Sequence, residues 1–151
     1  MITFLPYSCF RCSAATLDYR RLGKQRIEAK QILNTLMGLS TAWANHPAVL
    51  MWKGYNESLV NYGIVVCEEW IDRGYNDNTL EFFNRFDDEP LVYPPWFGDQ
   101  RLHRSHQSRL FSKDSDHYSQ FASVFDLPYF WPTHYSRFDR QPYSCEHNHG
   151  L

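Results

Sequence analysis

Apolar residues recur every three or four positions between Asp18 and Met37, the longest such pattern in the chain. At about 100° per residue, this spacing places them on one face of an α-helix. The apolar face holds Leu22, Ala29, Ile32, Leu33 and Leu36, and the opposite face holds Arg20, Lys24, Glu28 and Gln31. The pattern predicts a helix that buries one side and presents the other to a partner. We expect it to begin at a cap formed by Ser13 and to end near Gly38.

A strip between the two faces contains Gly23 and Arg26, and Arg26 leans toward the apolar side. A glycine inside a helix costs about 1 kcal/mol relative to alanine, so we expect a crossing helix or a ligand to come close at Gly23. Arg26 either extends its guanidinium to water or faces a bound ligand. The pattern leaves both interpretations of Arg26 open.

The remaining pattern predicts shorter elements around this helix. Pro47 suits the first turn of a short helix, with Asn45 and His46 at its N-terminus. The aromatic stripe over residues 55–73 predicts a second core helix, which Gly74 ends. Further predicted elements are a strand or extended arm over residues 2–7, a short helix from Asn76 or Asp77 to Phe86, a helix over residues 101–113 capped by Asp99, and one more helical turn over residues 114–121.

Together these elements predict an all-α fold: a compact single-domain helical bundle with an extended N-terminal arm and an irregular, aromatic-rich C-terminal segment. At 151 residues the chain can bury a core without metals or disulfides. Its eleven Phe, ten Tyr and five Trp leave several rings for a surface that stacks on bases or sugars. We expect residues 1–132 to form the domain and residues 133–151, which have no period, to form a loosely structured tail.

The predicted helix over residues 101–113 has two contrasting faces. The apolar face holds Leu102, His106 and Leu110, so we interpret His106 as a hydrogen-bonded core histidine. The polar face holds Arg101, Arg104, Ser105, Ser108 and Ser112. Guanidinium and hydroxyl donors in this pattern fit the phosphate backbone of a nucleic acid, although a plain solvated face has the same pattern.

Charge is distributed unevenly along the chain, although the formal net charge is only −2. Residues 20–30 contain five basic residues and one acidic residue, and residues 101–113 contain four basic residues and no acidic one. Residues 68–89 contain eight acidic residues and two arginines. The two basic helices predict a phosphate-facing side, whereas the low net charge argues against indiscriminate coating of nucleic acid.

Several familiar signals are absent from the sequence. It contains no phosphate-binding G-x-x-x-x-G-K, no dinucleotide-binding G-x-G-x-x-G and no H-E-x-x-H zinc motif. Cys9 and Cys12 have the chemistry to join Cys145, His147 and His149 at a zinc ion, but more than 130 residues separate the two groups. We therefore expect no metal and no cofactor. Without a signal peptide or a membrane-spanning segment, we expect a cytoplasmic protein with reduced cysteines.

Glu28 is the one carboxylate in the basic part of the long predicted helix, four residues after Lys24. One interpretation is an ion pair along the helix, which stabilises it by about 0.2–0.5 kcal/mol. The other is a carboxylate that nearby arginines hold ionised beside a bound phosphodiester, where it acts on a sugar or a proton. The sequence leaves both interpretations open.

Several short blocks resemble a known family. The run Tyr19-Arg20-Arg21-Leu22, preceded by a short arm and followed by Arg26, resembles the pyrimidine-dimer DNA glycosylases of the endonuclease V type. The blocks LGKQR at 22–26, NHP at 45–47, PPWFG at 94–98, HRSH at 103–106 and YFWP at 129–132 resemble a group of small bacterial and phage proteins assigned to the same superfamily. These blocks span most of residues 1–132.

The resemblance implies a helical enzyme that kinks duplex DNA and flips a base out of the stack. It also implies that the terminal amine attacks the sugar C1′, forms an imine and permits strand cleavage by β-elimination, assisted by a carboxylate on the first helix. Two positions depart from the family pattern. The bulky Ile2 disfavours removal of Met1, and Arg21 stands where the family has a glutamate. Glu28, two turns further along, would have to replace that glutamate.

We therefore hypothesise a DNA glycosylase with AP-lyase activity that recognises damaged or modified pyrimidines in duplex DNA. The predicted catalytic residues are Met1, Arg21, Arg26 and Glu28. The predicted DNA-binding residues are Arg20, Lys24, Lys30, Asn45, His46, Arg101, Arg104, Ser105 and Ser108. We expect Arg26→Ala to abolish activity with folding intact, and Lys24 is an alternative imine-forming amine. Two other functions stay open: a non-catalytic nucleic-acid-binding module with this fold, and an enzyme that acts on a free or modified nucleotide.

Overall fold

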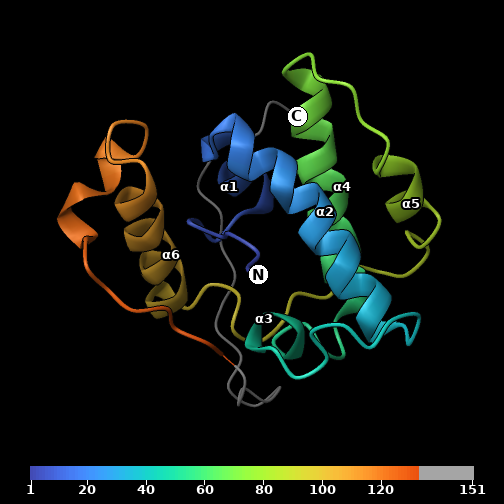
Figure 1. Ribbon diagram of the computed structural model, residues 1–151. Coiled ribbons are helices and arrows are strands. Elements are labelled where there is room, and N and C mark those ends of the chain that lie inside the picture. The colour runs from blue at the N-terminus through green and yellow to red at the C-terminus, as the bar shows by residue number, and fades with distance from the viewer. Residues whose placement is uncertain (133–151) are drawn as a thin grey trace.

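The computed structural model describes residues 1–132, in which helices surround a buried N-terminal arm formed by residues 1–9 (Figure 1). The helices are α1 (Phe10–Thr16), α2 (Tyr19–Leu36), α3 (Pro47–Leu50), α4 (Asn56–Asp72), α5 (Leu80–Asn84) and α6 (Gln100–Lys113), followed by the 3₁₀ helix η1 (Ser119–Val124). This part of the chain contains no strand, which confirms the predicted all-α class. None of its helices is long and apolar enough to cross a membrane. The predicted tail, residues 133–151, lies outside the described residues.

The long helix α2 begins after Asp18, so the prediction of one continuous helix from Ser13 to Gly38 was wrong. Leu17 has an extended ψ of 139°, which ends α1, and the Asp18 carboxylate accepts a hydrogen bond from the backbone nitrogen of Arg21. An acidic cap satisfies an unpaired amide and suits the helix dipole. Ser13 instead lies inside α1, where its hydroxyl bonds the backbone of Tyr7.

Helix α2 packs against α4, which is the predicted second core helix (Figure 1). A Cβ on Gly23 would lie 3.0 Å from the Trp70 ring, closer than almost all side-chain contacts, so Gly23 serves helix packing. The Arg26 guanidinium lies 4.4 Å from the centre of the same ring and forms an ion pair with Asp77, ahead of α5. With its side chain only 12% exposed, Arg26 keeps its guanidinium inside the fold instead of extending it to water.

The shorter predicted elements differ from the structure mainly at their ends. Helix α5 ends at Asn84, two residues before its predicted end, and Asp77 accepts a hydrogen bond from Leu80 N at 2.7 Å at its start. Helix α6 begins after Asp99, whose carboxylate caps it as predicted. The helical turn after α6 lies at residues 119–124 instead of 114–121.

The N-terminal arm is extended, but its backbone is held by side chains instead of by a neighbouring strand. Phe4 N donates to Gln25 Oε1 at 2.8 Å, and Leu5 N donates to His106 Nδ1 at 2.9 Å. The Tyr62 hydroxyl donates to Phe4 O at 2.9 Å. Buried backbone groups need hydrogen-bond partners, and here side chains of α2, α4 and α6 supply them. These contacts fix the start of the chain beside α2.

Two buried histidines of α6 contact the arm. His103 Nδ1 lies 2.7 Å from Leu5 O, and Gly98 N donates to His103 Nε2 at 3.0 Å. Burial lowers the pKa of both histidines, and the pKa of His106, which the neighbouring His103 lowers further, falls to about 3. His106 is therefore the hydrogen-bonded core histidine that its position between two leucines predicted.

We expect the free energy of unfolding to fall as the pH drops below about 6.5, the ordinary histidine pKa. The unfolded chain binds a proton at His106 near this pH, whereas the folded chain does so only near its pKa of about 3. A proton that binds only to the unfolded state lowers the free energy of unfolding by about 1 kcal/mol for each unit that the pH falls. Urea unfolding between about pH 7 and about pH 5 measures this slope. His106→Asn, which can still accept from Leu5 N, should flatten it, and equal slopes would contradict the prediction.

Candidate active site

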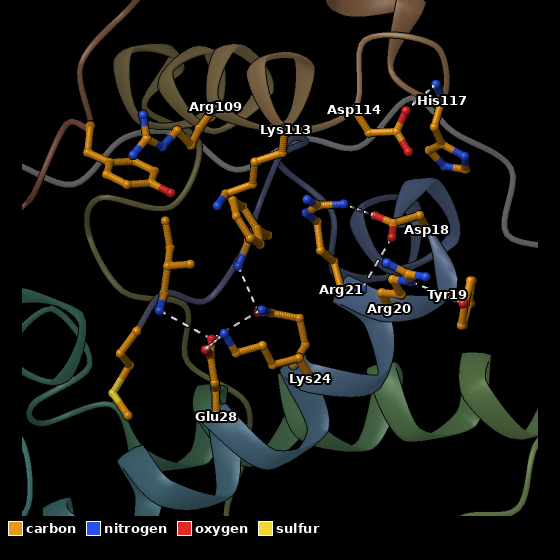
Figure 2. A pocket seen from close by; sticks show the side chains of 15 residues that line it. Asp18, Tyr19, Arg20, Arg21, Lys24, Glu28, Arg109, Lys113, Asp114 and His117 are labelled. Carbon is orange, nitrogen blue, oxygen red and sulfur yellow. Dashed lines mark hydrogen bonds and ion pairs between the residues drawn. The ribbon is translucent and has the colours of Figure 1, made fainter.

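A pocket of about 860 Å³ opens between α2, α6 and the first residues of the N-terminal arm (Figure 2). Its cationic lining residues are Arg20, Arg21, Lys24, Arg109 and Lys113. Figure 2 shows Arg109 and Lys113 extending into it from α6, while Lys24 and Glu28 extend into it from α2 on the other side. Guanidinium and ammonium groups that converge in this way suit a phosphodiester.

Glu28 lies in this pocket and is itself buried, with 5% of the residue exposed. Its Oε2 accepts hydrogen bonds from Ile2 N at 3.2 Å and from Gln25 Nε2 at 3.3 Å. Its Oε1 lies 3.6 Å from Lys24 Nζ. The predicted ion pair with Lys24 is therefore present, but it is only one of the contacts. Because both oxygens have partners, the carboxylate is held in one orientation, facing the first peptide of the chain.

Gln25, which the sequence analysis did not select, links Glu28 to the arm. Its Nε2 donates to Glu28, and its Oε1 accepts from Phe4 N at 2.8 Å and shares the Tyr62 hydroxyl proton with Phe4 O, at 2.8 Å from the hydroxyl oxygen. Burial raises the pKa of Tyr62 well above its ordinary value, and the charge of Glu28 adds to this effect, so the hydroxyl remains a donor. The sequence feature that could have identified Gln25 is an amide side chain three residues before Glu28, close to the apolar face of the helix.

Arg21 is held in the pocket by Asp18. Its Nη1 lies 3.2 Å from Asp18 Oδ1. The Tyr118 hydroxyl donates to the same carboxylate and accepts from Asp18 N at 2.9 Å. Burial acts to raise the pKa of Asp18, but hydrogen bonds from Tyr118 and Arg21 outweigh it and lower that pKa. The ionised Asp18 therefore anchors the guanidinium at the pocket wall.

Comparison with protein-family models matches residues 1–82 to a family described as pyrimidine dimer DNA glycosylase. The chain belongs to the pyrimidine dimer DNA glycosylase family. The match covers more than half of the chain and includes the arm, α2 and Glu28, whereas α6 lies beyond it. No curated protein and no solved structure matches the chain. The family's function is of the DNA glycosylase type, in DNA repair, and its substrate is DNA.

This pocket brings together five of the predicted site residues, namely Met1, Arg20, Arg21, Lys24 and Glu28. Two cations that the sequence analysis did not select, Arg109 and Lys113, complete it. They lie four residues apart on α6 and therefore share a face of the helix. This spacing is the sequence feature that could have identified them. Burial lowers the pKa of Lys113, and the nearby cations lower it further, against the opposing charge of Glu28.

Four other predicted cations lie outside the pocket. Arg26 forms the ion pair with Asp77 ahead of α5. Lys30 lies 4.9 Å from the centre of the Phe82 ring. Arg101 pairs with the Asp99 cap at 2.6 Å, and Arg104 is exposed on α6. The cationic lining therefore comes from other positions on the same two helices.

Ser105 and Ser108 are buried, so the prediction that they share an exposed, phosphate-facing side of α6 was wrong. Ser105 Oγ accepts a hydrogen bond from Phe130 N at 3.2 Å, and Ser108 Oγ accepts one from Leu127 N at 2.8 Å. The segment after η1 covers this side of the helix. The two hydroxyls supply acceptors that its backbone needs.

Asn45 and His46 lie at the start of α3. Asn45 is exposed, and His46 Nδ1 accepts a hydrogen bond from Ala48 N at 3.0 Å, which caps the helix. Burial lowers the pKa of His46, the charge of the amino terminus lowers it further, and Glu28 opposes both. His46 is therefore affected by the charges of the amino terminus and Glu28, although it does not line the pocket.

Among residues 1–132, no group of three or more His, Cys, Asp or Glu side chains is arranged to hold a metal ion. Cys9 is buried, and its Sγ accepts a hydrogen bond from Cys12 N at 3.3 Å, which caps α1. The other members of the considered zinc site, Cys145, His147 and His149, lie outside the described residues.

Proposed function

We propose that this chain is a DNA N-glycosylase with AP-lyase activity that acts on damaged or modified pyrimidines in duplex DNA. The observation that carries the proposal is the 3.2 Å hydrogen bond from Ile2 N to Glu28 Oε2, inside a pocket lined by five cations. It supports a terminal amine poised beside a buried carboxylate, with phosphate-binding groups around both. The carboxylate is Glu28, two turns beyond the position where family members carry a glutamate.

In the proposed reaction, the amine nitrogen attacks C1′ of the damaged nucleotide, and the glycosidic bond breaks as the base leaves with the electron pair and takes up a proton. The nitrogen then loses its protons and O4′ leaves C1′ as a hydroxyl, which opens the sugar and yields an imine. Removal of a proton from C2′ expels the 3′ phosphate by β-elimination and cuts the strand, an endonuclease activity. Glu28 is placed to accept and return these protons.

Three nitrogens near Glu28 are candidates for the reacting amine. Met1 lines the pocket and carries the terminal amine, and we propose it as the nucleophile. The Ile2 nitrogen would become the terminal amine in a chain from which Met1 is removed, a step that its bulky side chain disfavours. Lys24 Nζ lies 3.6 Å from Glu28 Oε1 and is the third candidate.

We propose that the pocket cations hold the phosphates on both sides of the reacting sugar. Arg20 extends from α2, and Arg109 and Lys113 extend from α6, so the two helices contact the strand from opposite sides (Figure 2). Phosphate contacts of this kind release counterions, so binding should weaken steeply with salt. Arg104, exposed outside the pocket, stays a predicted contact to the DNA backbone.

The proposal is tested by incubating the protein with duplex DNA that carries an abasic site or a cyclobutane pyrimidine dimer, with and without borohydride. Borohydride reduces an imine to a stable secondary amine, so a covalent adduct in the intact mass is the expected result. Peptide mapping of the adduct identifies Met1, Ile2 or Lys24 as the reacting residue. Duplex binding without adduct, base release or cleavage would overturn the enzyme and favour the binding module.

A further inference from the structure

Four rings form a chain from the surface toward the pocket. The His46 ring lies between Trp43 and Trp131, with centroid distances of 5.8 Å to each and interplanar angles of 86° and 89°. Trp131 in turn packs at 5.3 Å from Tyr129, which lines the pocket. In Figure 1 the segment after η1 runs from α6 toward α3, which brings Trp131 to His46. The pocket is therefore continuous with an aromatic surface.

Trp43, at the outer end of this chain, is both strained and exposed. Its φ of 62° lies in the left-handed region, which costs energy for any residue except glycine, and 55% of the residue is exposed. The loop around it is held in place, because His46 N donates to Trp43 O at 2.9 Å and Thr35 Oγ1 donates to Ala42 O at 2.7 Å. Strain that does not bury the ring points to a role in binding.

Polar groups beside Trp43 suit a heteroaromatic ligand. His46 Nδ1 accepts from Ala48 N, so the neutral ring carries its proton on Nε2 and presents a donor there. The exposed Asn45 adds an amide with both donors and an acceptor. Flat rings for stacking and short polar groups for edge contacts are the features that recognise an unpaired nucleobase.

We propose that Trp43, His46 and Trp131 form a subsite for one unpaired nucleobase of the bound DNA, with Trp43 stacking on its face. This inference rests on the proposed function, since the base comes from DNA held at the pocket. A base that leaves the duplex loses its stacking partners. The exposed Trp43 ring replaces one of them, so the subsite stabilises the opened duplex beside the reacting sugar.

The test compares binding of two duplexes, one with a single unpaired 2-aminopurine and the other fully paired. Wild-type protein should prefer the unpaired base and quench its fluorescence on binding. Trp43→Gly suits the left-handed backbone and removes the ring, so it should lower this preference roughly tenfold. Trp43→Phe should retain most of it. Phe125→Ala removes another exposed ring, outside the aromatic chain, and should change nothing.

The subsite would be overturned if folded Trp43→Gly protein preferred the unpaired base as strongly as the wild type does. Unquenched 2-aminopurine in the wild-type complex would also overturn it. Quenching by wild-type protein is measured without any variant, so the test does not depend on how well Trp43→Gly folds. Imine trapping on abasic DNA is scored separately. Trapping without the base preference rejects the subsite alone, and the preference without trapping rejects the glycosylase chemistry alone.

Discussion

Replacing Glu28 with glutamine is expected to abolish imine trapping on abasic DNA and to slow base release by a hundredfold or more, on the order of what a positioned acid–base group contributes. Glutamine keeps the side-chain shape, and its carbonyl oxygen still accepts from Ile2 N, so the arm should remain in place. What is lost is the negative charge and the ability to take up protons from the amine. Gel-based cleavage, borohydride trapping and intact mass measure the result.

Two further variants separate this effect from general changes in charge. Glu69→Gln removes a carboxylate of α4 that pairs with Arg73 at 2.9 Å outside the pocket, and it should leave trapping unchanged. Lys24→Met removes the charged partner of Glu28 and, if Met1 supplies the amine, should reduce trapping much less than Glu28→Gln. Full trapping by Glu28→Gln would show that Glu28 only holds the arm.

Arg26→Ala is expected to destabilise the protein by about 3–5 kcal/mol, the usual cost of breaking a buried ion pair. The Asp77 side chain is 3% exposed and would keep its charge without its partner. The Trp70 ring would also lose the guanidinium that covers it at 4.4 Å. This replaces the expectation from sequence that the variant stays folded. Urea unfolding followed by circular dichroism measures the difference.

The double variant Arg26→Met, Asp77→Asn tests whether the buried charge causes the loss. Asparagine can still accept from Leu80 N at the start of α5, and methionine still covers Trp70. The double variant should therefore be more stable than Arg26→Ala. Lys30→Ala, one turn further along α2, removes a cation that contacts only a ring and should cost less than about 1 kcal/mol. If Arg26→Ala lowered the free energy of unfolding by as little as Lys30→Ala, the structural role of Arg26 would be refuted.

Features of the fold that depend on neighbouring residues were predictable. The cap at Asp99 acts on an amide two positions away, and the apolar spacing of α2 reflects one buried face. The break at Leu17 was missed because helical periodicity continues on both sides of it. Tyr118, one hundred residues away in sequence, accepts a hydrogen bond from Asp18 N and supports that break. No local pattern contains such a contact.

The candidate site shows the same limit more sharply. Glu28 was selected as an ionisable residue among cations, but its contact with Ile2 N comes from the path of the arm. Arg26 and Arg21 look alike as basic residues of one helix, yet only Arg21 reaches the pocket. Their roles differ because Trp70 and Asp77, from other elements, enclose Arg26. Likewise, Ser108 looked solvated until the later segment was seen to cover it.

The buried arm has a practical consequence for anyone who prepares this protein. Because Met1 lines the pocket, a purification handle fused ahead of it would have to leave through the space proposed for DNA. The fusion would also convert the terminal amine into an ordinary peptide nitrogen. A preparation of this kind would give no trapping through Met1, whatever the natural chain does. Only removal of the handle back to Met1 would restore a fair test.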